Sequence, residues 1–310
     1  LKQLPSVPAT MLLRDLVTPC KWDNYSAEER KQHQRIFRGD AVCFPLFTLL
    51  YVFGLLRMAA PDWASLPGGR PRSPPAFIGV LSLICFLFSL IPLWQHAMVA
   101  PLPTKDMTRS FCSMATFGKF IFLTRQGLFF QPLHLFFTLM GSAPLSMGWT
   151  TFFAQRAHEG APICALLCLV ITCQYFVLVA PNPAQKVEEE KWAARGLPYK
   201  EVMYTCHVPC GILALVDVLV LKDREALLAM HASVPGLFLV SKLFLTYIFF
   251  YVTLVHVNFT ICGHMPYGFM ESWGRKPKPW AILIAAQICC LMVMHLVLLL
   301  LESSLVPACW

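Results

Sequence analysis

Seven long runs of apolar residues alternate with shorter polar segments along the chain of 310 residues. Each run is continuous over roughly 18–28 residues, and a helix needs about 20 to cross a bilayer. A membrane β-strand would instead show alternation over about ten residues. The pattern therefore predicts an all-α, polytopic transmembrane helical bundle of about seven spans. The predicted spans cover roughly 41–59, 77–99, 115–140, 161–180, 204–221, 231–258 and 280–301.

Composition agrees with a membrane protein. Hydrophobic residues make up 57% of the chain and charged residues 14%, whereas soluble domains carry about 25% charged residues. This excludes a soluble, disordered or fibrous protein. The formal charge of +8 predicts basic loops against an anionic leaflet, so we expect membrane lipids as partners and no nucleic acid. Most of the 13 cysteines lie in apolar runs, where they are expected to be reduced packing residues.

The first 40 residues differ from the rest because they are largely polar. Ser26-Ala-Glu-Glu29 has the spacing of a capping box, which predicts a short amphipathic helix at about 26–38. This helix is expected on the bilayer surface or on a partner, or else as a solvated leader to the first span. We therefore expect two parts, a polar N-terminal segment (1–40) and a transmembrane helical domain (41–310).

The basic residues are distributed unevenly between the two predicted sides. With seven spans, sixteen Lys and Arg fall on the side of the N-terminus and six on the other. Such an excess marks the cytoplasmic side, or the matrix side in mitochondria. The sequence therefore predicts an N-terminus on that side. Tryptophans near span ends, Trp273 and Trp280 among them, are expected in the interfacial belt.

The third predicted span carries a group of intramembrane polar residues: Lys119, Thr124, Arg125, Gln126, Gln131 and His134. Thr124, Gln131 and His134 are separated by seven and three residues, so they share one face of a helix. One interpretation is a polar cavity inside the bundle. The other is interhelical hydrogen bonding, with Lys119 and Arg125 extending to the membrane surface.

Asp217 is the one acidic residue at mid-span depth. A charge in the bilayer needs a partner or water. The candidate partners are Arg125, Lys119, Lys242 or a residue of a neighbouring subunit. Structural pairing is the main interpretation, and proton transfer is the alternative.

The sequence predicts no metal site and no cofactor. Cys206-His207-Val-Pro-Cys210 lacks a second ligand pair at the spacing of a zinc site. His256 and other membrane histidines leave open the alternative of a carrier of haem, quinone or another small molecule. A Gly-rich phosphate loop and a G-x-S-x-G motif are both missing from the sequence.

Three stretches resemble the androgen-induced protein family, whose members are membrane-embedded threonine hydrolases that cleave fatty-acid esters of hydroxy fatty acids. The first stretch is Phe122-Leu-Thr-Arg-Gln-Gly-Leu-Phe-Phe-Gln131. The second runs from Val208 through Lys222-Asp-Arg-Glu225 to Met230-His231. The third comprises Tyr247-Ile-Phe-Phe250, Val255-His256 and Pro266-Tyr-Gly-Phe-Met-Glu271. Together they cover about a third of the chain. The resemblance implies that Thr124 is the nucleophile and that His231 activates it.

Two functions are therefore expected. The first is an accessory or structural subunit of a large complex, expected in the mitochondrial inner membrane and built on a hydrolase-like fold. The chain begins with Leu1, as expected after removal of a presequence, and a long polar N-terminal segment needs a partner to hold it. The alternative is an active threonine hydrolase of lipid esters, with the endoplasmic reticulum as the alternative membrane.

Overall fold

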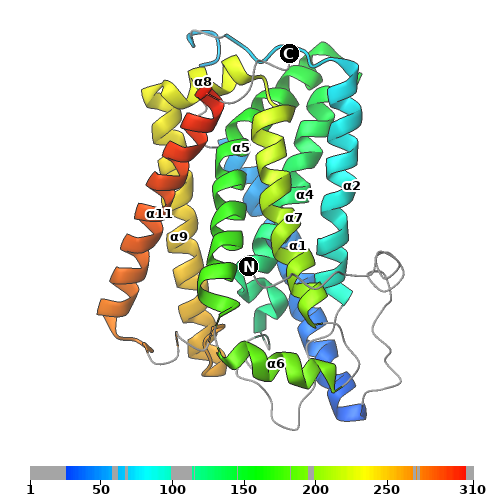
Figure 1. Cartoon of the computed structure of the whole chain (residues 1–310), viewed down its shortest axis with the longest axis vertical. Helices are drawn as coiled ribbons and strands as arrows, with labels where there is room; N and C mark the ends of the chain where they lie inside the picture. Colours follow the sequence, from blue (N-terminus) through cyan, green and yellow to red (C-terminus); the bar gives the residue numbers. More distant parts are fainter. Residues whose placement is uncertain are drawn as a thin grey trace, which may run out of the picture.

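The computed structural model describes residues 26–57, 62–66, 69–98, 114, 116–144, 146–181, 183–194, 199–267, 270 and 273–304. Within these ranges the secondary structure is helical throughout. Seven long helices follow the long axis of the molecule (Figure 1). They are α1 (Ala27–Arg57), α2 (Ala76–Met98), α4 (Leu123–Ser142), α5 (Met147–Gln174), α7 (Tyr199–Val216), α9 (Val234–Cys262) and α11 (Pro277–Ser304).

Five shorter helices connect or extend the long ones. A 3₁₀ turn, η3 (Gly118–Ile121), precedes α4, and two π-helices, η4 (Tyr175–Val179) and η5 (Asp217–Leu221), continue α5 and α7. Helix α6 (Pro183–Ala193) lies across the lower end of the bundle in Figure 1, and α8 (Arg224–Ala232) lies at the upper end.

The long helices confirm the predicted bundle of about seven spans. Six of them are long and apolar enough to cross a membrane. The seventh is α4, whose polar residues lower its hydropathy but whose side chains are mostly buried. It packs mainly against α5 and α2, and also against α7. A polar helix in this position is shielded from lipid by its apolar neighbours.

The described ends of the chain lie at opposite ends of the bundle. Helix α1 begins at the lower end in Figure 1, and successive long helices run in alternating directions until α11 finishes at the upper end. An odd number of crossings requires this arrangement. The sequence-based expectation of an odd number of spans is therefore consistent with the fold.

The boundary predicted at residue 40 falls inside a continuous helix. The capping box is confirmed, since Ser26 N–H donates to Glu29 Oε2 (2.7 Å) and Glu29 N–H donates to Ser26 Oγ (3.3 Å). The amphipathic segment at 26–38 then continues without a break into the first span as α1. Pro45 is the one proline inside α1, so no proline interrupts the helix at the expected boundary. Residues 1–25 of the polar segment lie outside the described residues.

The span predicted at 231–258 is wrong at its start. Ser233 is extended and caps the end of α8, and α9 begins at Val234 with Pro235 in its first turn. Proline suits the first turn of a helix, where its missing N–H needs no intrahelical partner, so Pro235 favours a new helix starting here. His231 therefore lies on the short helix α8 and not on the long spanning helix.

A close backbone crossing joins α1 to η3. Gly118 has a φ of +58°, and a Cβ there would lie 2.4 Å from Asp40 Oδ1 and 2.5 Å from Asp40 N. Gly39 faces it, since a Cβ on Gly39 would lie 2.5 Å from Gly118 N. Asp40 Oδ1 also accepts a hydrogen bond from Lys119 N–H (2.7 Å). This crossing fixes the start of α4 against α1.

We expect Gly118→Ala to destabilise the protein by about 3 kcal/mol, because a left-handed backbone and a steric clash both oppose the new methyl group. Gly263→Ala is the matched control. Gly263 also has a positive φ (+76°), but a Cβ there meets nothing within 4 Å. The control should cost about 1 kcal/mol. Unfolding by SDS in mixed micelles measures both values, and equal losses would contradict the clash.

Candidate active site

The polar face of α4 lies against α7 and its continuation η5. The two helices run in the same direction, so polar residues at matching heights meet along the contact. Thr124, Gln131 and His134 do share one face, as the sequence predicted, and that face forms interhelical hydrogen bonds. Thr124 Oγ1 lies 3.2 Å from His207 Nε2, Gln131 Nε2 donates to Cys210 O (2.7 Å), and His134 Nε2 lies 2.8 Å from Asp217 Oδ2.

The contact between Thr124 and His207 has the geometry of a nucleophile and its base. His207 is buried, and its Nδ1 lies 2.7 Å from Met203 O. A carbonyl oxygen only accepts, so this hydrogen bond assigns the proton to Nδ1. Nε2 then carries the lone pair and accepts the hydroxyl proton of Thr124. A threonine hydroxyl needs such a neighbour because it is a weak nucleophile.

Neighbouring groups hold the imidazole of His207 in place. The ring of Tyr175, the first residue of η4, stacks on it with a centroid distance of 3.9 Å. Thr172 Oγ1 donates to His207 O (2.7 Å), and this bond joins α5 to α7. The base is thus fixed through its ring, its Nδ1 and its own backbone. Such packing and hydrogen bonding lock the rotamer, as a catalytic base requires.

Tyr267 completes the surroundings of Thr124. Its hydroxyl accepts a hydrogen bond (3.2 Å) from the N–H of Leu123, the residue before Thr124 in the first turn of α4. Thr124 is the second residue of α4, where helix N–H groups lack intrahelical partners and the helix dipole is positive. A negative oxygen forming beside Thr124 would therefore meet a hydroxyl donor and a favourable helix end.

The structure does not bring Thr124 and His231 together. His231 lies on α8, where its ring is 5.3 Å from that of His295 of α11. Helix α8 begins two residues after Lys222, whose ammonium donates to Thr138 Oγ1 (2.7 Å) on α4. Thr124 and Thr138 are fourteen residues apart, or about 21 Å along a helix axis. The pair implied by the family resemblance therefore lies at opposite ends of the bundle.

A second polar network occupies the upper half of the same interface. The carboxylate of Asp217 forms an ion pair with the ammonium of Lys222, and it accepts hydrogen bonds from Thr138 Oγ1 (3.2 Å) and His134 Nε2. His134 Nδ1 then accepts from Tyr51 Oη at 3.0 Å. Asp217, Lys222 and His134 are all buried, so each charge is neutralised within the protein.

Within the chain, Asp217 pairs with none of the three basic residues expected for it. Arg125 donates to Leu93 O (3.0 Å), and Lys242 lies on an exposed face of α9. The actual partner, Lys222, is five residues along the chain. In an α-helix such a pair does not face one another. Lys222, however, is the extended residue that ends η5, so its position relative to Asp217 does not follow helical spacing.

Lys119 and Arg125 do not extend to the surface, because both are buried. The ammonium of Lys119 lies 6.0 Å from the centre of the Phe37 ring, and the guanidinium of Arg125 lies 5.2 Å from that of Phe120. Aromatic faces attract cations electrostatically. Both cations thus stabilise the junction of α1, η3 and α4.

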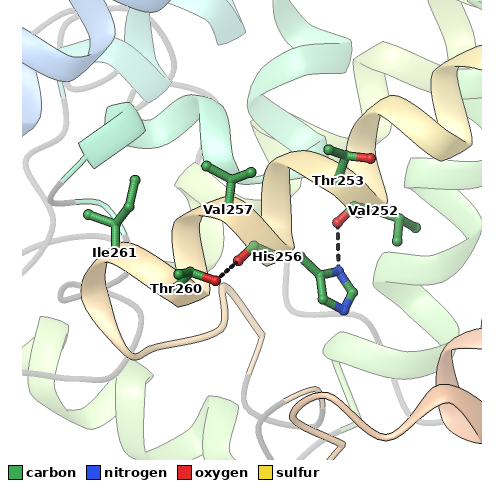
Figure 2. A pocket seen from close by; sticks show the side chains of 6 residues that line it. All are labelled: Val252, Thr253, His256, Val257, Thr260 and Ile261. Atoms are coloured by element: carbon green, nitrogen blue, oxygen red, sulfur yellow. Dashed lines mark hydrogen bonds between the residues drawn. The ribbon is translucent and has the colours of Figure 1, made fainter.

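His256 belongs to neither network. Its Nδ1 donates to Val252 O (2.8 Å), and its ring lies 4.3 Å from that of Trp280. It lines a groove on α9 (Figure 2). Across the described ranges, no three His, Cys, Asp or Glu side chains are placed to share a metal ion.

Outside the spans, Asp223 anchors the start of α8. Burial raises the pKa of its carboxyl, but hydrogen bonds from the side chain and backbone of Arg72 outweigh burial and bring the pKa below its usual range. A lowered pKa means that the contribution of Asp223 to stability is present at neutral pH. It is lost as the pH falls through the folded-state value, below about pH 4.

We expect Arg72→Gln to reduce stability at pH 7 and to reduce it less as the pH falls below about 4. The loss is at most about 1 kcal/mol, because Arg72 is 49% exposed and solvent screens the pair. Chemical unfolding at a series of pH values measures it. Arg70→Gln, a change at an exposed arginine nearby, is the control. If the difference in free energy of unfolding between wild type and Arg72→Gln grew below pH 4, it would contradict the pairing of Arg72 with ionised Asp223.

Comparison with protein-family models, with curated proteins and with solved structures gave no match. The candidate site therefore rests on its own geometry.

Sequence reasoning missed His207, Tyr267 and Lys222 as members of these networks. One signal in the sequence pointed to the first. Thr124 and His134 are ten residues apart on α4, and His207 and Asp217 are ten residues apart on α7 and η5. Equal polar spacing on two parallel helices lets both pairs meet at once. No comparable signal marks Tyr267, which reaches the site from a turn after α9.

Proposed function

We propose that this protein is a membrane-embedded hydrolase of lipid esters, with Thr124 as nucleophile and His207 as general base. One observation carries the proposal. Thr124 Oγ1 lies 3.2 Å from the Nε2 of a histidine whose Nδ1 is held by a backbone carbonyl. The resemblance of residues 122–131 to the helix of a threonine nucleophile supports the same residue, whereas the geometry favours His207 over His231 as its base.

The proposed reaction proceeds in two halves. His207 takes the hydroxyl proton of Thr124 while Oγ1 attacks the ester carbonyl, and Tyr267 and the first turn of α4 stabilise the negative oxygen of the tetrahedral intermediate. Protonated His207 then donates its proton to the departing alcohol, which leaves an acyl-threonine. In the second half His207 activates a water molecule, which releases the fatty acid and restores Thr124.

The outer surface of the bundle supports a lipid substrate. The bundle exposes large apolar side chains on α1, α2, α9 and α11, as expected of a protein surrounded by acyl chains. An ester dissolved in the bilayer reaches such a protein by lateral diffusion. We place the lower end of the bundle in Figure 1, where α4 begins, on the cytoplasmic or matrix side, because the basic residues at the start of α1 and in α6 lie at that end.

The proposal is tested with purified protein in detergent micelles. We expect release of free fatty acid from a fatty-acid ester of a hydroxy fatty acid. We also expect covalent labelling by a fluorophosphonate, with peptide mass spectrometry locating the label on Thr124. Labelling of another residue, or no hydrolysis by protein that elutes as a single species, would overturn the proposal.

The expected accessory subunit of a large membrane complex, in the mitochondrial inner membrane, is the second candidate. Helix α11 supports it, because only 6% of its apolar window is buried. It leaves large side chains exposed, such as Ile282, Met292 and Leu296. Partner helices bury such a face in a complex. Native gel electrophoresis of the endogenous protein tests this: migration near 35 kDa plus detergent would reject the subunit, and a much larger species would support it.

A further inference from the structure

A groove runs along the outer face of α9 in its C-terminal half (Figure 2). It has a volume of about 440 Å³. Val257 and Ile261 are strongly exposed within it. The groove occupies three successive turns of the helix, and it is lined by Val252, Thr253, His256, Val257, Thr260 and Ile261.

The polar side chains in this groove are turned to the backbone of α9. Thr253 Oγ1 donates to Phe249 O (2.7 Å), and Thr260 Oγ1 donates to His256 O (2.9 Å). His256 Nδ1 likewise donates to Val252 O (Figure 2). These donors are already used within the helix, so the groove offers mainly hydrocarbon surface. An acyl chain matches such a wall better than a polar ligand does.

The lower end of the groove is cationic. Arg275 Nη2 lies 3.4 Å from Thr260 Oγ1, at the edge of the groove. Lys276 and Lys278 follow it and are exposed. Three cations in four residues thus stand beside the end of an apolar groove.

Aromatic residues hold this cationic turn in a defined place. Trp280 Nε1 donates to Gly274 O (2.9 Å), and its ring packs against His256 of α9. The ring of Trp273 lies 5.7 Å from that of Trp280. Tryptophan side chains of this kind gather at the level of lipid headgroups. The turn is therefore fixed to α9 at the depth where a phosphate would lie.

We propose that this groove binds one anionic phospholipid, with an acyl chain along Val257 and Ile261 and the headgroup phosphate at Arg275 and Lys276. Charge complementarity selects the occupant. A phosphate accepts hydrogen bonds from a guanidinium and attracts ammonium groups, and a net negative headgroup neutralises the cations, which a zwitterionic headgroup does not. Val257 and Ile261 lie on the exposed side of α9, whereas Tyr251 and Val255 face the core, so the proposal is independent of hydrolysis at Thr124.

Native mass spectrometry of the purified full-length protein tests the proposal. The protein is incubated with phosphatidylglycerol or phosphatidylcholine of the same acyl chains, and the lipid retained is measured at increasing collision energy. We expect one phosphatidylglycerol to be retained more strongly than phosphatidylcholine. The double variant Arg275→Gln/Lys276→Gln should reduce this retention at least about fivefold.

Two further variants separate the contribution of the cations to lipid retention from that of the groove. Arg30→Gln/Lys31→Gln removes two exposed cations from the same end of the bundle and should leave retention unchanged. Val257→Trp fills the groove but keeps the cations, and it should also reduce retention. Equal retention of the two lipids by the wild type would overturn the proposal without any variant. The proposal would also be overturned if Arg30→Gln/Lys31→Gln lost as much lipid retention as Arg275→Gln/Lys276→Gln. Unchanged lipid retention in Val257→Trp would overturn it as well.

Discussion

Replacing His207 by glutamine is expected to reduce hydrolysis of a lipid ester by about 10²–10⁴-fold, the usual contribution of a general base. Glutamine fills similar space and can still hydrogen-bond, but it has no nitrogen that takes a proton near neutral pH. Thr124→Ala removes the nucleophile and should abolish the formation of an acyl-enzyme. Thr124→Ser keeps a hydroxyl in hydrogen-bond reach of Nε2 and should retain measurable activity.

His231→Gln is the control that distinguishes the base favoured by the geometry, His207, from the base implied by the family resemblance, His231. His231 contacts His295 at the far end of the bundle, so its replacement should change the hydrolytic rate by less than about threefold. Fatty-acid release is measured for each variant under single-turnover and steady-state conditions. Loss of activity in His231→Gln with full activity in His207→Gln would reverse the assignment, and it would require a conformation in which α8 approaches the start of α4.

Much of the fold was predictable because it follows from one-dimensional patterns. Apolar runs of sufficient length gave the seven spans, and the capping-box spacing located the start of α1. The interruption before Val234 is weaker in sequence, since apolar residues surround it on both sides. Two residues together mark α8 as a separate helix: Asp223, which is its N-cap, and Pro235, which lies in the first turn of α9.

The site was predictable only in part. Periodicity placed Thr124, Gln131 and His134 on one face, and the structure confirms this. Periodicity does not reveal which helix that face contacts, because the choice of partner depends on how the helices pack in three dimensions. The pairing of Asp217 with Lys222 was hidden for a different reason: Lys222 lies just past the end of η5 with an extended backbone, and helical spacing rules do not apply to such a residue.

The ion pair between Asp217 and Lys222 gives the largest expected effect on stability. Lys222→Met leaves the carboxylate of Asp217 buried beside a neutral His134, and Asp217→Leu leaves the ammonium buried without a counter-charge. Removing one partner of a buried pair costs about 3–5 kcal/mol. We therefore expect each single variant to lose about that much free energy of unfolding in SDS titrations of mixed micelles.

The double variant Asp217→Leu/Lys222→Met should recover most of this loss, since it removes both charges and replaces them with apolar side chains of similar volume. Lys242→Met, on an exposed face of α9, is the matched control for loss of a lysine and should change stability by less than about 0.5 kcal/mol. Additive losses in the double variant would mean that the two groups act separately. Recovery would instead show that Asp217 and Lys222 neutralise one another within the bundle, where Asp217 also accepts hydrogen bonds from His134 and Thr138 of α4.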